Sequence, residues 1–394
     1  MTLSALLLSA ALAALQPEPS DQARRIAQET IILDGHVDVP YRVARSGEDV
    51  GEATEAGDFD YPRAMEGGLN APFMSIYVAA TYQETGGAKA QADRLIGLIE
   101  GLTFQHPDKF EIAKSPADVR RITGEGKIAL PLGMENGAPI EGDLGNLQHF
   151  YDRGIRYITL THSKVNHISD SSYDEERRWG GLSPFGEMMV SRMNDLGIMV
   201  DVSHISDEAF DDVMRISRAP VIASHSSLRH FTPGFERNMS DRMVRELGKK
   251  GGVVMINFGS SFLTKDANER RSAADAAYEA AVERGGGTAT DEGRMGYVAA
   301  WNEANPYPYA DLEDVLDHID RAVRLAGIDH VGIGSDYDGV GDSLPTGLKD
   351  AASFPVLVEG LLGRGYSEEE VKKILSGNAM RVWEEVEQVA SERE

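Results

Sequence analysis

The sequence predicts an α/β fold, a single (β/α)8 barrel of the TIM type with loop insertions at its C-terminal mouth. Short apolar segments rich in β-branched residues recur along the 394-residue chain, and segments with helical periodicity separate them. Most of these segments are near-continuous apolar runs, which is typical of parallel strands covered on both faces. We expect eight strands, at 30–38, 71–80, 127–135, 155–162, 197–204, 219–225, 251–258 and 329–336.

The intervening segments predict the helices of the barrel. GEMMVSRMNDL at 186–196 and DEAFDDVMRIS at 207–217 have the apolar spacing of amphipathic helices. Eight strand-then-helix units in succession favour a closed barrel. A doubly wound open sheet is the alternative, but no G-x-G-x-x-G turn follows the first predicted strand. We therefore expect one domain over residues 21–390.

Two insertions interrupt the alternation. Residues 42–68 are polar and rich in glycine, and residues 260–308 are rich in Ala and Glu and contain the aromatic stretch NPYPY. In a barrel both insertions belong over the C-terminal mouth, where loops enclose substrate. A solubilising role without substrate contact is the alternative.

The N-terminal residues predict export. Residues 1–16 contain an apolar run too short to cross a bilayer, and small residues towards its end suit a signal-peptide cleavage site, although Lys and Arg are missing from the first few positions. A buried or amphipathic first helix is the alternative. The chain has no cysteine, and the C-terminal VEQVASERE carries no apolar tail. We expect a periplasmic or secreted bacterial protein without a stable membrane anchor.

The charge balance limits the partners. The formal net charge is −25, and the acidic residues are spread along the chain rather than gathered in a tail. A phosphate backbone would be repelled by most of this surface, so nucleic acid is not an expected partner.

Residues with metal-binding side chains end most of the predicted strands. Because parallel strands of a barrel deliver their C-terminal ends to one mouth, these side chains should converge although they are far apart in sequence. They are His36, Asp38, Glu135, His162, His204, His225 and Asp336.

Imidazole together with carboxylate suits Zn²⁺ and related divalent ions. Five ligands, His36, Asp38, Glu135, His204 and His225, are too many for one tetrahedral zinc with an open position but suit two metals that share a carboxylate. Glu135 is the predicted bridge, with His36 and Asp38 completing one site and His204 and His225 the other. Two zinc ions about 3.5–4 Å apart can hold a hydroxide between them, which indicates hydrolysis.

Amide hydrolysis also requires proton transfer and stabilisation of negative charge. Asp336 can accept the proton of the attacking solvent and return it to the leaving amine. Asp338 is the competing choice, since residues i and i+2 of a strand share a face. His162 can donate to the tetrahedral intermediate or instead support a metal ligand.

At this point the sequence resembles the membrane (renal) dipeptidases of the amidohydrolase superfamily. The matching segments follow the family order and cover nearly all of the chain after residue 20: LDGHVD, YPRAMEGGLNAPFMSIYV, MENG, GIRYITLTHS, GLSPFG, LGIMVDVSHIS, PVIASHSS, RNMSD, DHVGIGSDYDG and GNAMRV.

The resemblance implies a binuclear zinc hydrolase that cleaves dipeptides of the type L-Xaa-L/D-Xaa. It assigns the five metal ligands as above, acid/base catalysis to Asp336, contact with the tetrahedral intermediate to His162, and binding of the substrate carboxylate to Arg237. A homodimer is compatible with it. The alternative is an amidohydrolase acting on N-acyl amino acids, lactones or β-lactams. Pro72, Met74 and the insertion at 260–308 depart from many relatives, which leaves the side-chain preference open.

Overall fold

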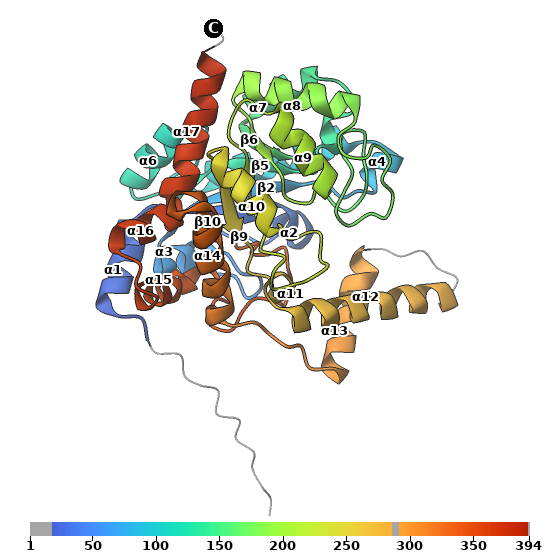
Figure 1. Cartoon of the computed structure of the whole chain (residues 1–394). Coiled ribbons are helices and arrows are strands. Elements are labelled where there is room, and N and C mark those ends of the chain that lie inside the picture. Colours follow the sequence, from blue (N-terminus) through green and yellow to red (C-terminus); the bar gives the residue numbers. More distant parts are fainter. Residues whose placement is uncertain (1–17, 286–290, 393–394) are drawn as a thin grey trace, which may run out of the picture.

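Eight parallel strands close into a barrel surrounded by helices (Figure 1), as the sequence predicts. We describe the protein from a computed structural model, in which residues 18–285 and 291–392 are placed well enough to describe. Around the barrel the strands follow in the order β1 (Ile32–Val37), β10 (Val331–Ile333), β9 (Val253–Ile256), β8 (Ile222–Ala223), β7 (Met199–Asp201), β6 (Ile155–Thr159), β5 (Leu132–Glu135) and β2 (Leu69–Tyr77).

The apolar runs become strands because both of their faces are covered. Every residue of β1 is buried, as is every residue of β5, β6 and β9. Strand β1 pairs with β2 on one side and with β10 on the other, which closes the barrel and leaves no free edge.

One predicted strand divides in two. The segment 127–135 forms β4 (Ile128–Leu130) and β5, with Pro131 between them. Proline has no amide hydrogen to continue a ladder, so the chain changes partner there. Strand β4 pairs with β3 (Phe110–Ile112) in a separate two-stranded sheet, while the Pro131 carbonyl accepts a hydrogen bond from Met74 at 2.8 Å.

Helices follow the strands around the outside. The predicted helices at 186–196 and 207–217 are confirmed as α8 (Pro184–Leu196) and α9 (Asp207–Ile216). Each begins with a serine that accepts a hydrogen bond from a first-turn amide, Ser183 from Gly186 and Ser206 from Ala209. The remaining α-helices are α1 (Asp21–Glu29), α2 (Val39–Ser46), α3 (Tyr61–Gly67), α4 (Tyr82–Thr85), α5 (Ala88–Gln105), α6 (Pro116–Gly124), α7 (Gly145–Arg153), α10 (Asp241–Lys249), α11 (Ser260–Leu263), α12 (Lys265–Gly285), α13 (Asp291–Ala304), α14 (Leu312–Ala326), α15 (Phe354–Gly363), α16 (Glu368–Lys372) and α17 (Asn378–Ser391).

Large side chains fill the barrel interior. The Phe73 ring of β2 lies 5.1 Å from the Tyr157 ring of β6 and 5.3 Å from the Trp383 ring of α17. Strands β2 and β6 are not neighbours in the sheet, so Phe73 and Tyr157 meet across the inside of the barrel. Tyr157 fits only because β5 has a glycine opposite it, since a Cβ at Gly133 would lie 2.0 Å from the Tyr157 ring.

Both predicted insertions start at the mouth. Residues 42–68 contact the loop after β10, where the Asp58 amide donates to Asp338 at 2.7 Å. The second insertion forms α11, α12 and α13, and the last two extend away from the barrel body (Figure 1). The predicted signal peptide, residues 1–16, lies outside the described residues. Within the described ranges, the helices are too short or too polar to cross a bilayer.

Candidate active site

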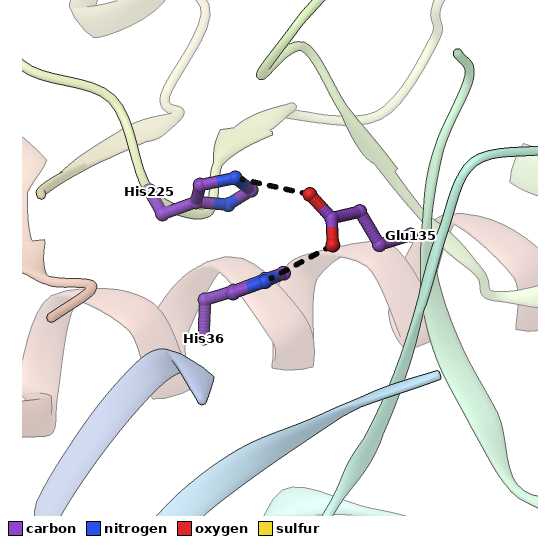
Figure 2. A group of neighbouring side chains, drawn as sticks. All are labelled: His36, Glu135 and His225. Atoms are coloured by element: carbon purple, nitrogen blue, oxygen red, sulfur yellow. Dashed lines mark ion pairs between the residues drawn. The ribbon is translucent and has the colours of Figure 1, made fainter. Parts of the chain in front are cut away.

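The strands place the predicted metal ligands at one end of the barrel. His36 lies within β1 and Glu135 ends β5, whereas the loops after β1, β7 and β8 carry Asp38, His204 and His225. Figure 2 shows the Glu135 carboxylate between the rings of His36 and His225, with a different carboxylate oxygen facing each ring. All five side chains are buried.

Glu135 offers its two oxygens to two groups of nitrogen atoms. Oε2 lies 3.4 Å from His36 Nε2, while Oε1 lies 3.1 Å from His204 Nε2 and 3.4 Å from His225 Nε2. Asp38 Oδ2 lies 3.4 Å from the same Nε2 atom of His36. A single carboxylate therefore connects the two predicted ligand pairs.

The polar atoms at the centre suit metal ions. His36 Nε2 and Asp38 Oδ1 are buried, and neither has a hydrogen-bond partner among the described residues. Buried polar atoms usually have partners, and a bound metal ion would satisfy these two. The ligand atoms of His36, Glu135 and His225 all lie within 4.8 Å of one another, as do those of Glu135, His162 and His204.

Hydrogen bonds behind His225 set its protonation. Ser224 Oγ lies 2.7 Å from His225 Nδ1 and donates at 2.7 Å to Asp201, which also accepts from Thr159 at 2.5 Å. Because the serine proton goes to the carboxylate, Ser224 Oγ accepts the proton of His225 Nδ1. The lone pair of His225 Nε2 then points into the site, the arrangement that metal-binding histidines use.

Tyr157 plays a similar part for His36. Its hydroxyl lies 2.8 Å from His36 Nδ1, which leaves Nε2 facing Glu135 and Asp38. Tyr157, a residue of the barrel interior, thus holds the imidazole ring of His36 in position.

Burial and charge adjust the protonation of the cluster. Burial tends to raise the pKa of Glu135, but the surrounding imidazoles, His36 foremost, outweigh it and hold that pKa well below its usual range. Burial lowers the pKa of His204 and of His225 well below the usual value, and nearby positive groups add to the effect. Burial tends to lower the pKa of His36, but Tyr157, Glu135 and Asp38 outweigh it and raise that pKa well above the usual value. The ionised Glu135 and the neutral rings of His204 and His225 are the forms that bind metal.

Asp336 lies beside the ligands with a pKa near neutrality. Burial, together with Asp38 and Glu135, raises its pKa to about 7, against the opposing effect of His36. Asn257, directly after β9, donates to Asp336 Oδ2 at 2.7 Å and orients the carboxyl group. The ligand atoms of Asp336, Asp38 and His36 lie within 4.8 Å of one another.

The competing residue, Asp338, faces away from the cluster. Its Oδ1 accepts from the Asp58 amide at 2.7 Å, and its Oδ2 lies 3.4 Å from Arg42 Nε. Its contacts are therefore with the first insertion, and the geometry favours Asp336 for chemistry.

His162 and Arg237 lie on the rim of the cluster. His162 Nε2 is 3.5 Å from Glu135 Oε1, and its ring packs edge-on against Tyr77, the last residue of β2. The Arg237 side chain is only 3% exposed, and it donates to Ser226 Oγ at 2.7 Å and to the His225 carbonyl at 2.8 Å. A buried guanidinium here gives the cluster of histidines and carboxylates one fixed positive group.

The sequence did not identify four residues that support the ligands, namely Tyr157, Asp201, Ser224 and Asn257. The sequence contained a signal for Asn257, because this polar residue comes directly after β9, as several predicted ligands come directly after their strands. The same signal existed for Asp201, which ends β7 as Glu135 ends β5, whereas Tyr157 lies inside β6 and looks like a core position.

Comparison with known proteins agrees with this geometry. The sequence profile of the membrane dipeptidase family, peptidase family M19, matches residues 20–394. The crystal structure of a probable dipeptidase, PvdM, from Pseudomonas aeruginosa is 29% identical, with a TM-score of 0.81 over 94% of this chain and 98% of that one.

A metallopeptidase from Rhodobacter sphaeroides, solved with a phosphinate mimic of the dipeptide L-Ala-D-Ala, is 26% identical. The TM-score is 0.74, and the match covers 91% of this chain and 99% of that one. The family profile spans almost the whole chain, and these similar structures share its barrel. The chain therefore belongs to the membrane dipeptidase family, peptidase family M19, and is a metallopeptidase of that family.

Proposed function

We propose that the chain hydrolyses dipeptides of the type L-Xaa-L/D-Xaa with two zinc ions bridged by Glu135. The observation that carries the proposal is the position of this carboxylate, whose two oxygens face His36 on one side and His204 and His225 on the other. The Rhodobacter relative, solved with a dipeptide mimic, supports the substrate class.

The donor set favours zinc over magnesium or calcium, since three of the five ligands are imidazoles. His36 and Asp38 would hold one ion, His204 and His225 the other, and Glu135 both. When bound, such a pair of ions lowers the pKa of water and polarises the scissile carbonyl.

Asp336 is the proposed acid/base. A group whose pKa lies near neutrality can both accept and release a proton at physiological pH. Asp336 takes the proton of the attacking water and delivers it to the nitrogen of the leaving amine, so that the products are a free carboxylic acid and an amine. Its hydrogen bond from Asn257 holds the carboxyl group in position through both transfers.

His162 and Arg237 are proposed to bind the substrate. His162 donates a hydrogen bond to the carbonyl oxygen as negative charge develops on it. Arg237 pairs with the C-terminal carboxylate, because a planar guanidinium can donate two parallel hydrogen bonds to a carboxylate. Its contact with the His225 carbonyl fixes it at a set distance from the metal ligands.

Assays on the zinc-loaded protein test the proposal. L-Ala-D-Ala, L-Ala-L-Ala and an N-acetyl amino acid are compared, before and after removal of metal by a chelator. We expect turnover of dipeptides that is lost on chelation and restored by zinc. Turnover of the N-acetyl amino acid alone would contradict dipeptide hydrolysis and would support an amidohydrolase that acts on other small amides.

We also propose that residues 1–16 direct export and are then removed. The support is the apolar run of this segment and the small residues towards its end. Expression of the full chain in a bacterium, with N-terminal sequencing of the periplasmic protein, tests this. An intact first residue in cytoplasmic protein would contradict it.

A further inference from the structure

The second insertion brings another arginine to the wall of the active site. Helix α12 starts shortly after β9, and its Arg271 lies with the guanidinium carbon 5.6 Å from the centre of the Tyr173 ring. The Tyr173 ring is itself 5.8 Å from the ring of His204, one of the proposed zinc ligands. Arg271 is therefore one aromatic ring away from the metal cluster.

Arg271 and Arg237 share a phenyl ring. The guanidinium carbon of Arg237 lies 5.3 Å from the centre of the Phe262 ring, and that of Arg271 lies 5.7 Å from the same centre. Phe262 belongs to α11, so the insertion supplies both this ring and Arg271. The arrangement puts two positive groups around one apolar surface.

The charge of Arg271 is only partly neutralised. Its Nε lies 3.7 Å from Asp275, but that carboxylate also pairs with Arg294 at 2.5 Å. Its Nη1 makes two long hydrogen bonds to neutral groups, 3.4 Å to the Tyr173 hydroxyl and 3.5 Å to Ser261. In the part of the chain that the structure describes, Nη2 donates to nothing, and the side chain is 30% exposed.

We infer that Arg271 binds the side-chain carboxylate of an acidic residue at the C-terminal position of the substrate, so that dipeptides ending in Asp or Glu are preferred. The inference rests on the proposed function and names its substrate class. Arg237 takes the main-chain carboxylate, Phe262 contacts the methylene carbons, and Arg271 takes the second carboxylate. A protein with a net charge of −25 repels substrates of net negative charge, such as dipeptides ending in Asp or Glu, unless positive groups in the site compensate.

The test compares L-Ala-L-Glu with L-Ala-L-Gln, which have nearly the same shape but differ by one charge. The zinc-loaded full-length protein is assayed as wild type, Arg271→Gln, Arg271→Lys and Lys265→Gln. Lys265 lies on the same helix and is 62% exposed, so its variant removes an equal charge without touching the site. The same series with D-Glu and D-Gln covers the other configuration.

We expect kcat/KM of the wild type to be at least about tenfold higher for the Glu substrate than for the Gln substrate, as for other charge-assisted contacts. Arg271→Gln removes this ratio mainly by raising KM for the Glu substrate and leaves the Gln substrate nearly unchanged. Arg271→Lys restores part of the ratio, and Lys265→Gln keeps all of it.

Three outcomes would overturn the inference. A wild type that prefers Gln or does not discriminate excludes an acidic preference. Arg271→Gln could instead lower kcat/KM equally for both substrates, with no Glu preference retained by Arg271→Lys. That result would assign Arg271 only the structural role of holding α12 against Tyr173. Failure to hydrolyse any dipeptide instead removes the proposed function, and this inference falls with it.

Discussion

The Nε2 atoms of His204 and His225 lie 2.9 Å apart, and both face Oε1 of Glu135. The two nitrogens can share the proton of one neutral ring in a hydrogen bond, whereas two lone pairs facing each other at this distance require a positive centre beside them. Burial lowers the pKa of both rings, so protonation is a poor source of that charge. A bound cation accounts for the arrangement, and the predictions below concern how the chain holds it and uses it.

Ser224→Ala tests the hydrogen bonds behind His225. The variant removes the group between His225 Nδ1 and Asp201, so the ring loses its fixed orientation. We expect zinc affinity to fall by about 10–100-fold, as is usual for the groups that orient metal ligands. Competition with a chelator measures it, and Ser191→Ala, an exposed serine of α8, is the control. Unchanged affinity would show that the ring needs no such support.

Asp336→Asn and Asp338→Asn separate the two candidate acids. Asparagine cannot carry the proton, so Asp336→Asn should bind zinc normally while kcat falls by about 10²–10⁴-fold. Asp338 contacts Arg42 and the Asp58 amide, so its variant should retain most of the turnover. Steady-state kinetics with measured zinc content decides, and equal losses in both variants would contradict the assignment.

Gly133→Ala tests the packing that supports His36. The new Cβ would lie 2.0 Å from the Tyr157 ring, whose hydroxyl contacts His36. Overpacking of this kind costs about 1–3 kcal/mol in the free energy of unfolding. Gly97→Ala is the matched control, because Gly97 lies inside α5 with open space beside it. That variant should gain about 0.5–1 kcal/mol through helix propensity. Chemical denaturation measures both, and equal effects would contradict the packing.

His318 makes stability depend on pH. Burial lowers its pKa to about 4, and the neutral ring accepts from the Leu228 amide and donates to the Leu263 carbonyl, each at 3.0 Å. An unfolded histidine has a pKa of about 6.5, so between these values the unfolded chain binds the additional proton. The stability contribution is complete above pH about 6.5 and is lost as the pH falls towards about 4, up to about 3 kcal/mol in all.

Urea unfolding of the wild type and His318→Gln from pH 7 to 4 measures this loss. Both proteins are studied with a chelator present, which removes the effect of protons competing with metal. We expect the two stabilities to converge as the pH falls, since only the wild type loses the contribution of His318. Parallel curves would assign the acid sensitivity to other groups.

Much of the barrel could be predicted from the sequence, because parallel strands buried on both faces leave near-continuous apolar runs. All eight predicted segments contribute a strand to the barrel. The division at Pro131 was missed, since the apolar residues on either side of the proline look like one run. The partner change depends on β3, a three-residue strand too short to recognise from its sequence.

The positions of the candidate site residues could also be predicted, because they follow from strand ends. His36, Glu135, His204 and His225 meet as expected, and the structure places Asp336, the residue chosen from the sequence, beside His36 and Asp38. Strand alternation places residues i and i+2 on one face, but β10 ends before either aspartate is reached. Both aspartates lie in the turn that follows and have a positive φ, 63° for Asp336 and 66° for Asp338. The turn directs the two side chains to different partners. Those of Asp338, Arg42 and Asp58, come from a segment too distant in the sequence to be anticipated.

Zinc analysis of Glu135→Gln beside the wild type tests the central claim most directly. The glutamine has nearly the same size but cannot place a negative oxygen on each side. The control is Glu141→Gln, six residues along and exposed. We predict two equivalents of zinc in the wild type and in the control, and at most one in Glu135→Gln. One equivalent in the wild type, or two retained by Glu135→Gln, would contradict a bridging carboxylate.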